Sequence, residues 1–416
     1  MLRSFTAGIV LAFAGSRANV ARTILSCAGI VVGVGSLILV VTGSDFGERF
    51  AIAYSETNAG RAATFEISVM EEVSDQEALE EDIRRAGAQE VSLFQTPSAS
   101  VLLRSGGTVI DTADFRGVDA SLGEIRRFTM AEGRWFTEAD LESRVPVLVV
   151  NEDLANAMGD RERVQIGTDR WTDVRIVGVL ESSGTDFTWQ SAYLLRSPAS
   201  EDLLFGPPPP GQADPYGDYM PSGGVTYLAR IDPGDPAAQD PTGTMFHERL
   251  TSTAWRWGVR SSDSVWGYRI DGADVIEDAV TYLSWGLAGI AAITLTTGLL
   301  GVLNVGLVTV RERRRELATY RALGASRFTL FVVVVMESVV VSLVAGVIAL
   351  LACWALVTAA AAVLESFVSL PTGVALAIPP SGVLVGLGSA AAVGLLAGIV
   401  PAMRALRSSV VAGLRE

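Results

Sequence analysis

The residue types that most enzymes use for acid–base or metal chemistry are scarce in this sequence. His247 is the single histidine, Cys27 and Cys353 are the only cysteines, and all 32 basic side chains are arginines. A P-loop needs a lysine against the β and γ phosphates of ATP, so the chain has no Walker-type ATP site. Zinc sites draw on cysteine and histidine, and a nucleophile needs an adjacent base. We therefore expect no catalytic centre, no metal site and no cofactor in this chain.

The residues with the most informative spacing lie between positions 311 and 327. Six arginines and two glutamates alternate here with apolar side chains, which predicts a short amphipathic helix. Gly324 is suited to end this helix in the left-handed conformation, and Ser326 to cap the next one. Docking on another protein is the favoured role, and a charge cluster that only enforces membrane topology is the alternative. The predicted contact residues are Arg313, Arg314, Arg315, Glu316, Leu317, Tyr320, Arg321, Leu323 and Gly324.

Three further residues stand out inside apolar stretches. Glu337 is the only acidic or basic side chain well inside such a stretch, and an intramembrane charge is a functional candidate. We favour a structural pair with Arg321, Arg327 or a backbone group near the cytoplasmic interface, with proton coupling as an alternative. Gly29 and Gly33 form a G-x-x-x-G pair, which permits close helix packing and could form a dimer seam.

Four apolar stretches must position these residues. Each has the roughly 20 residues that a helix needs to cross a hydrocarbon core of about 30 Å. The chain is 49% hydrophobic yet carries a net charge of −14, so its apolar and charged residues are segregated. The four predicted crossings span residues 24–43, 282–310, 328–363 and 381–402.

The arginines outside these stretches indicate the orientation. Arginines precede the first stretch, occur in the connection 311–327 between the second and third stretches, and follow the fourth stretch. The connection 364–380 between the third and fourth stretches has none. The positive-inside rule then places both termini in the cytoplasm of a multi-pass protein. We expect segment 1–23 to hold a short interfacial helix, 311–327 to form a cytoplasmic loop and 403–416 a cytoplasmic tail. The third stretch is longer than one crossing needs and should tilt or project from the membrane.

Residues 44–275 then form a large domain outside the membrane. This block holds 39 acidic residues and 20 arginines, which suits a soluble surface and argues against nucleic-acid binding. It has no cysteine, so the domain must rely on its hydrophobic core, for which about 230 residues suffice.

The pattern within this block predicts an α/β domain. A helix over 74–87 should be capped by Ser74, with Glu77 completing a capping box, and Asn151 should cap a helix that Gly159 closes. The strand candidates are 64–70, 91–103, 108–118, 145–150, 174–180 and 192–195.

Two parts of the block have open interpretations. Residues 197–224 are rich in proline and glycine and predict a long loop, either a functional flap or a plain flexible excursion. Trp255, Trp257, Trp266 and Tyr268 precede the second crossing, where they could anchor a membrane interface or belong to the domain core.

Several segments together resemble one family. Arg-Arg-Arg-Glu-Leu (313–317), Arg-Ala-Leu-Gly-Ala-Ser (321–326) and Met-Glu-Ser (336–338) are similar to the signature of MacB/FtsX-type permeases, the type VII ABC transporters. Residues 17–35 look like the family's entry to its first helix, and 401–405 with 414–415 like its closing segment. Residues 132–140 resemble the G-R-x-F-x-x-x-D passage of the MacB periplasmic core, and 176–180, which follow Ile166 and Gly167, resemble a later strand of it.

The resemblance implies a bacterial cytoplasmic-membrane permease with four transmembrane helices and a large extracytoplasmic α/β domain like the MacB periplasmic core. It implies a homodimer or a pair with a homologous permease, and a separate ATPase subunit that holds ATP and Mg. Residues 313–324 would be the coupling helix, through which ATP-driven motion reaches the outer domain (mechanotransmission). Membrane lipid and an extracytoplasmic lipoprotein or substrate-binding protein are further expected partners.

The expected function is export or extraction of a lipid, peptide, lipoprotein or drug. One alternative is an FtsX-like regulator of an extracytoplasmic cell-wall hydrolase, although the outer domains of FtsX proteins are much smaller than the domain expected here. Another is a membrane-anchored sensor or adhesion protein without an ATPase, which would need no coupling helix.

Overall fold

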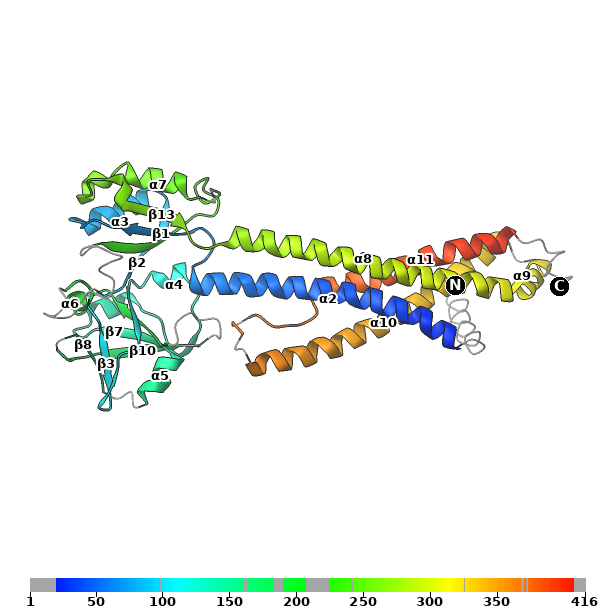
Figure 1. The fold of residues 1–416 in the computed structure, drawn as a ribbon, viewed down its shortest axis with the longest axis horizontal. Helices are drawn as coiled ribbons and strands as arrows, with labels where there is room; N and C mark the ends of the chain where they lie inside the picture. Colours follow the sequence, from blue (N-terminus) through cyan, green and yellow to red (C-terminus); the bar gives the residue numbers. More distant parts are fainter. Residues whose placement is uncertain are drawn as a thin grey trace. The chain divides into compact units, whose positions relative to one another are not determined.

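The computed structural model of the chain forms two compact units (Figure 1). It describes residues 20–97, 99–159, 163–168, 170–182, 190–206, 224–240, 242–324, 326–367, 370–371 and 373–407. The helical unit comprises Met1–Arg49, Glu277–Phe367 and Ala375–Glu416, and the globular unit comprises Phe50–Ile276 and Val368–Val374. The predicted interfacial helix within 1–23 lies outside the described residues.

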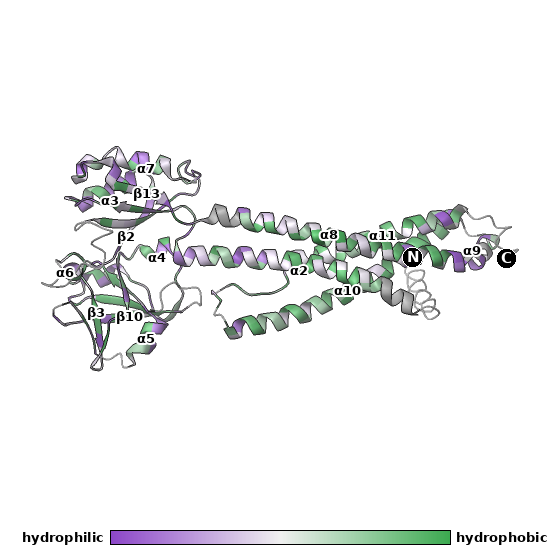
Figure 2. Ribbon diagram, viewed as in Figure 1, coloured by the Kyte–Doolittle hydropathy of each residue, from purple (hydrophilic) through white to green (hydrophobic). Residues whose placement is uncertain are grey.

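The helical unit contains four helices that are long and apolar enough to cross a membrane. Figure 2 shows hydrophobic residues along most of these helices. They are α2 (Val20–Asn58), α8 (Ala273–Glu312), α10 (Arg327–Phe367) and α11 (Pro380–Arg407). Three of them are much longer than a bilayer requires, since about 20 residues suffice. Each of these helices therefore continues beyond its predicted crossing.

Small residues let α10 and α11 pack closely. A Cβ atom placed on Gly394 would lie 2.6 Å from the Cα atom of Val339, and one on Gly398 would lie 2.9 Å from that of Val335. Only glycine permits backbones to approach this far. The buried residues between the helices are also mostly small or β-branched: Ile30, Val34, Ile38, Val302, Ala345, Ala349, Cys353, Ala390, Val393 and Ala397.

The globular unit is built on a nine-stranded mixed sheet in the order β13-β1-β12-β2-β5-β11-β7-β10-β6. The pairs β5–β11 and β7–β10 are parallel, and the other neighbours are antiparallel. The strands are β1 (Thr64–Val69), β2 (Ala88–Gln95), β5 (Asp114–Val118), β6 (Met130–Gly133), β7 (Val147–Asn151), β10 (Arg175–Leu180), β11 (Ser191–Leu195), β12 (Val225–Ile231) and β13 (Val265–Arg269).

A second, four-stranded sheet has the order β4-β3-β8-β9. Its strands are β3 (Leu102–Ser105), β4 (Thr108–Ile110), β8 (Val164–Gly167) and β9 (Thr172–Asp173). The helices of the unit are α3 (Gln76–Arg85), α4 (Leu122–Ile125), α5 (Glu152–Met158), α6 (Glu201–Phe205) and α7 (Thr244–Thr251), with 3-10 turns η2 (Glu138–Glu142), η3 (Ala254–Trp257) and η4 (Ser262–Ser264).

The predicted caps are confirmed at one helix and wrong at another. Asn151 accepts a hydrogen bond from the backbone N–H of Leu154 at 3.0 Å and caps α5, as expected. At α3 the cap is Asp75, which accepts from the N–H of Ala78, and not Ser74. The reason is a contact between residues far apart in the sequence: the backbone N–H of Ser74 donates a hydrogen bond to the carbonyl of Trp257.

The aromatic residues before α8 divide between core and surface. Trp257 is fully buried, and its indole N–H donates to Asp82 at 3.1 Å. Trp255, Trp266 and Tyr268 are exposed. The core interpretation therefore holds for Trp257 alone. In the predicted loop 197–224, residues 201–205 form α6, and 207–223 lie outside the described residues.

Candidate functional site

The short helix α9 (Arg314–Ala322) lies between the ends of α8 and α10. Gly324 has a φ of +97°, so the chain turns there in a conformation that favours glycine. Ser326 accepts a hydrogen bond from the backbone N–H of Thr329 at 3.0 Å and so caps α10. Both local predictions are confirmed. The sequence therefore folds residues 311–327 into helix, turn and cap, as its pattern indicates.

An ion pair anchors α9 to the membrane helices. Arg313 precedes α9 and donates to Glu337 of α10 at 3.1 Å, and its Nε atom lies 3.2 Å from Glu316. A structural pair at Glu337 is present as expected, but its partner is Arg313 and not Arg321, Arg327 or a backbone group, so the predicted partner is wrong. Glu337 lies ten residues into α10, about 15 Å along the axis from Arg327 at a rise of 1.5 Å per residue. The end of α8 lies beside it instead.

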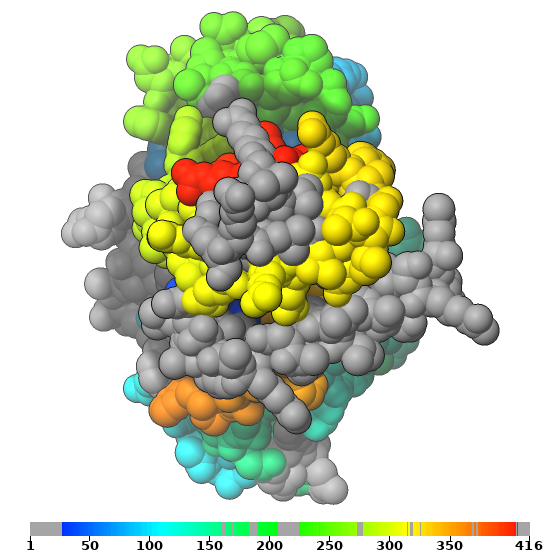
Figure 3. Space-filling model, turned by 90° about the vertical axis from the view of Figure 1, so that its right-hand side faces the viewer, coloured from blue at the N-terminus to red at the C-terminus, as the bar shows by residue number. Residues whose placement is uncertain are grey.

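The surface of α9 is cationic and apolar at once. Tyr320 is 49% exposed and Leu323 is 79% exposed, and Arg315 and Glu316 are exposed beside them. Arg321 is half-buried, and the side chains of Arg314 and Leu317 lie outside the described part of the structure. Figure 3 shows this face in yellow, at the same end of the helical unit as the red end of α11. The single chain leaves these apolar side chains uncovered.

Gly29 and Gly33 pack against α8 of the same chain. A Cβ atom on Gly29 would lie 3.2 Å from the Cα atom of Gly298, and one on Gly33 would lie 2.9 Å from that of Leu295. The close approach that the G-x-x-x-G spacing predicts is present. It joins α2 to α8 within one chain, so this face of α2 is not free to form a dimer seam.

The passage from Gly133 to Asp140 forms a buried charge cluster in the globular unit. Asp140 is 1% exposed and accepts hydrogen bonds from Arg134 at 2.6 Å and from Arg175 at 2.9 Å. The bond from Arg134, with those from the backbone and side chain of Thr137, holds the pKa of Asp140 well below its usual range. The cluster ties the turn after β6 to β10, so these motif residues have a structural role.

Two family models match the chain. The MacB-like periplasmic core domain matches residues 23–238, slightly more than half of the sequence, and the FtsX-like permease C-terminal domain matches residues 288–410. The chain belongs to the MacB/FtsX family of ABC transporter permeases. The α9 segment lies within the FtsX-like match. The expected fold class, a four-helix membrane protein with a large α/β domain, is confirmed.

The relatives include proteins of two lengths. The macrolide export ATP-binding/permease protein MacB of Hyphomonas neptunium is 25% identical over 436 residues, covering 98% of this chain and 60% of MacB. The uncharacterized ABC transporter permease YknZ of Bacillus subtilis is 24% identical and covers 99% of both chains. This MacB/FtsX permease chain therefore spans about 60% of the length of the MacB proteins it matches.

A solved structure is also similar to the globular unit. The periplasmic region of MacB from Actinobacillus actinomycetemcomitans covers 53% of this chain and 92% of its own, at 16% identity and a TM-score of 0.34.

Proposed function

We propose that this permease couples ATP hydrolysis by a separate ATPase subunit to movement of its globular unit. The observation that carries the proposal is α9, a short helix between two membrane helices with exposed cationic and apolar side chains. The chain has no lysine and so no P-loop of its own, and ATP and Mg would be held by the partner.

The chemistry of α9 defines the partner surface. Leu323 and Tyr320 are exposed in the single chain, and apolar side chains of this size usually anchor protein interfaces. The neighbouring arginines favour a groove with acidic groups. An ATPase with an apolar groove and an acidic rim would therefore cover α9.

The Arg313–Glu337 ion pair supports transmission of movement. It joins the residue before α9 to a position inside α10, at 3.1 Å. A displacement of α9 would then reach both α8, through the chain, and α10, through this pair. We propose that these long helices pass the movement on, which is the mechanotransmission that the family resemblance implies.

The proposed orientation places α9 and both termini in the cytoplasm of a bacterium, with the globular unit outside. The arginines of residues 311–327 and those after α11 support it by the positive-inside rule. Exposed apolar residues of α8, such as Trp285 at 74% and Ile293 at 69%, suit contact with lipid or a second permease chain. We infer a homodimer or a pair with a homologous permease.

We propose export or extraction as the outcome of this movement, with a lipid, peptide, lipoprotein or drug as substrate. The MacB relatives are named macrolide export proteins, which supports the export part of the proposal. Glu337 is the only charged residue well inside a predicted crossing, which supports handling of the substrate outside the membrane core. An extracytoplasmic lipoprotein or substrate-binding protein is a further proposed partner.

The test is purification of the tagged chain from its native membrane in mild detergent, followed by mass spectrometry and an ATPase assay. We expect a Walker-motif protein to co-purify with the wild type and to be lost with Leu323→Asp. Leu141→Asp is the matched control, because Leu141 is an exposed leucine of the globular unit at 41%. An unchanged ATPase yield with Leu323→Asp, or no ATPase with the wild type, would refute the proposal.

A further inference from the structure

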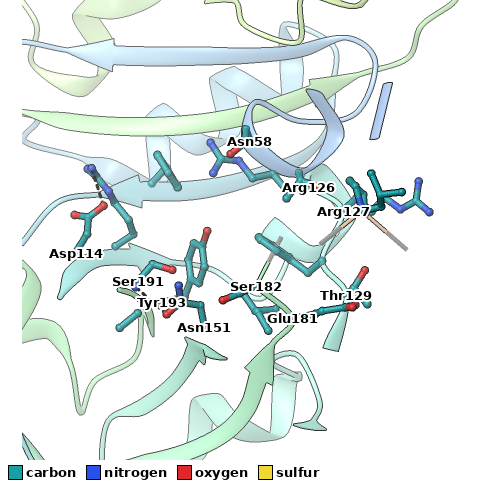
Figure 4. Close-up of a pocket in the computed structure, with 18 residues that line it drawn as sticks. Asn58, Asp114, Arg126, Arg127, Thr129, Asn151, Glu181, Ser182, Ser191 and Tyr193 are labelled. Carbon is teal, nitrogen blue, oxygen red and sulfur yellow. Dashed lines mark hydrogen bonds and ion pairs between the residues drawn. The ribbon is translucent and has the colours of Figure 1, made fainter. Parts of the chain in front are cut away.

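The globular unit contains a cavity of about 230 Å³ that the proposed function does not use. Its wall includes β2, β5, β10 and β11, the residues after α4, and Leu370 and Pro371 from the connection between α10 and α11. All of these belong to the globular unit. Figure 4 shows that Tyr193 points toward the side of the cavity on which Arg126 lies.

Arg126 is the unusual residue of this cavity. Its side chain is 9% exposed, and its guanidinium carbon lies 4.4 Å from the centre of the Phe94 ring. Its Nε atom has no hydrogen-bond partner, and the described residues supply no carboxylate within ion-pair distance. Burial lowers the pKa of Arg126, and Tyr193 opposes the change by hydrogen bonding. An arginine remains charged at neutral pH even so.

The two other arginines of the cavity wall have acidic partners. Arg116 lies 3.3 Å from Asp114, and Arg127 lies 3.2 Å from Glu56. A buried charge without a partner costs much more free energy than a paired one. Among the described residues no carboxylate forms a direct ion pair with Arg126, which lines the cavity; Tyr193 and the more remote charge of Glu66 are its polar neighbours.

The remaining wall limits the kind of anion that fits. Phe128, Leu180, Leu370 and Pro371 present apolar surface, which suits the body of an organic molecule. Glu181 also lines the cavity, so a group with one negative charge is favoured over a multiply charged one such as phosphate. A guanidinium binds a carboxylate through two parallel hydrogen bonds.

We propose that this cavity binds a small organic monocarboxylate, whose carboxylate pairs with Arg126 and whose apolar body packs against Phe128, Leu370 and Pro371. Such a ligand touches both the sheet and the 370–371 segment, so it would also hold that segment against the sheet. This site is independent of ATPase docking by α9.

The test uses the full chain in detergent, with benzoate as the probe and benzamide as its neutral isostere, at constant ionic strength. We expect benzoate to raise the Tm of the wild type and benzamide to leave it unchanged. Arg126→Met should remove the benzoate effect and weaken the calorimetric affinity about tenfold or more, because a charge-assisted pair is lost. Its Tm without ligand should equal or exceed that of the wild type, because an unpaired buried charge is removed.

Arg84→Met is the matched control, because Arg84 is an exposed arginine in a surface pair with Glu80. It should keep the full response to benzoate. Equal responses to benzoate and benzamide, or an unchanged benzoate response in Arg126→Met, would overturn the proposal. If Arg126→Met does not fold, Arg126→Lys decides: it keeps the charge but loses the planar fork. We then expect a several-fold weaker affinity, and an unchanged affinity would also overturn the proposal.

Discussion

Arg313 contacts Glu337 at 3.1 Å, and so links the start of α9 to a point three turns inside α10. Both side chains are about one-third exposed, so the pair lies at an edge of the helical unit and is not deeply buried. The same guanidinium also contacts Glu316 at 3.2 Å. One arginine thus fixes the orientation of α9 relative to α10.

Glu337→Gln tests this link. We expect a loss of ATPase-coupled activity of threefold or more, because α9 can then move without α10. Stability should change by only about 1 kcal/mol or less, since the pair is partly exposed. ATPase stimulation in proteoliposomes and thermal unfolding measure the two effects. Glu365→Gln, at the exposed end of α10, is the control, and equal coupling in both variants would contradict the prediction.

Gly324→Ala tests the turn after α9. A φ of +97° strains any residue with a Cβ atom, so we expect a cost of about 1–2 kcal/mol and weaker coupling. Gly324→Pro should abolish coupling while the chain still inserts, because proline fixes φ near −65°. Gly107→Ala is the control, since Gly107 has a φ of +91° and open space around it. If Gly107→Ala reduced coupling equally, the loss of coupling would result from backbone strain in general and not from the turn after α9.

Gly298→Ala tests the packing of α2 on α8. A Cβ atom there would lie 2.7 Å from the carbonyl oxygen of Gly29, so the helices must move apart. We expect a loss of about 1–3 kcal/mol in stability. Thermal unfolding in detergent measures it. Gly301→Ala lies on the same helix with no atom within 4 Å and should be neutral or slightly stabilising, and equal losses in both variants would refute the packing argument.

Asp140→Asn tests the buried charge cluster. Loss of a charged acceptor for Arg134 and Arg175 should cost about 2–3 kcal/mol at neutral pH. The pKa of Asp140 is lowered in the folded state, so its contribution is full above the unfolded pKa of about 3.9 and declines as pH falls below it. Unfolding curves measured from pH 7 to 2 should therefore keep a constant separation between wild type and variant above about pH 4 and narrow below it. Glu138→Gln, which changes an exposed glutamate, is the control. If the curves of wild type and Asp140→Asn stay the same distance apart over the whole pH range, the lowered pKa of Asp140 is not the source of the stability difference.

Local features of the chain could be predicted well from sequence. Asn151, Gly324 and Ser326 act through neighbours within four residues, so their types and spacing suffice. The membrane helices follow from their length and apolar composition. Strands β12 and β13 are not among the predicted strands, because they take their places by pairing with β1 and, for β12, also with β2, both of which lie more than 100 residues earlier.

The family signature, the four apolar helices, the cationic segment before α10 and the lack of a P-loop in this sequence can all be read from residue types and their spacing. The packing of distant segments determines that Glu337 pairs with Arg313, that Gly29 and Gly33 face α8, and that the Nε atom of Arg126 is buried without a hydrogen-bond partner among the described residues. The physical reason is the same in each case. A side chain's partner depends on which distant segments pack beside it, and composition and periodicity specify only which face of each segment is buried.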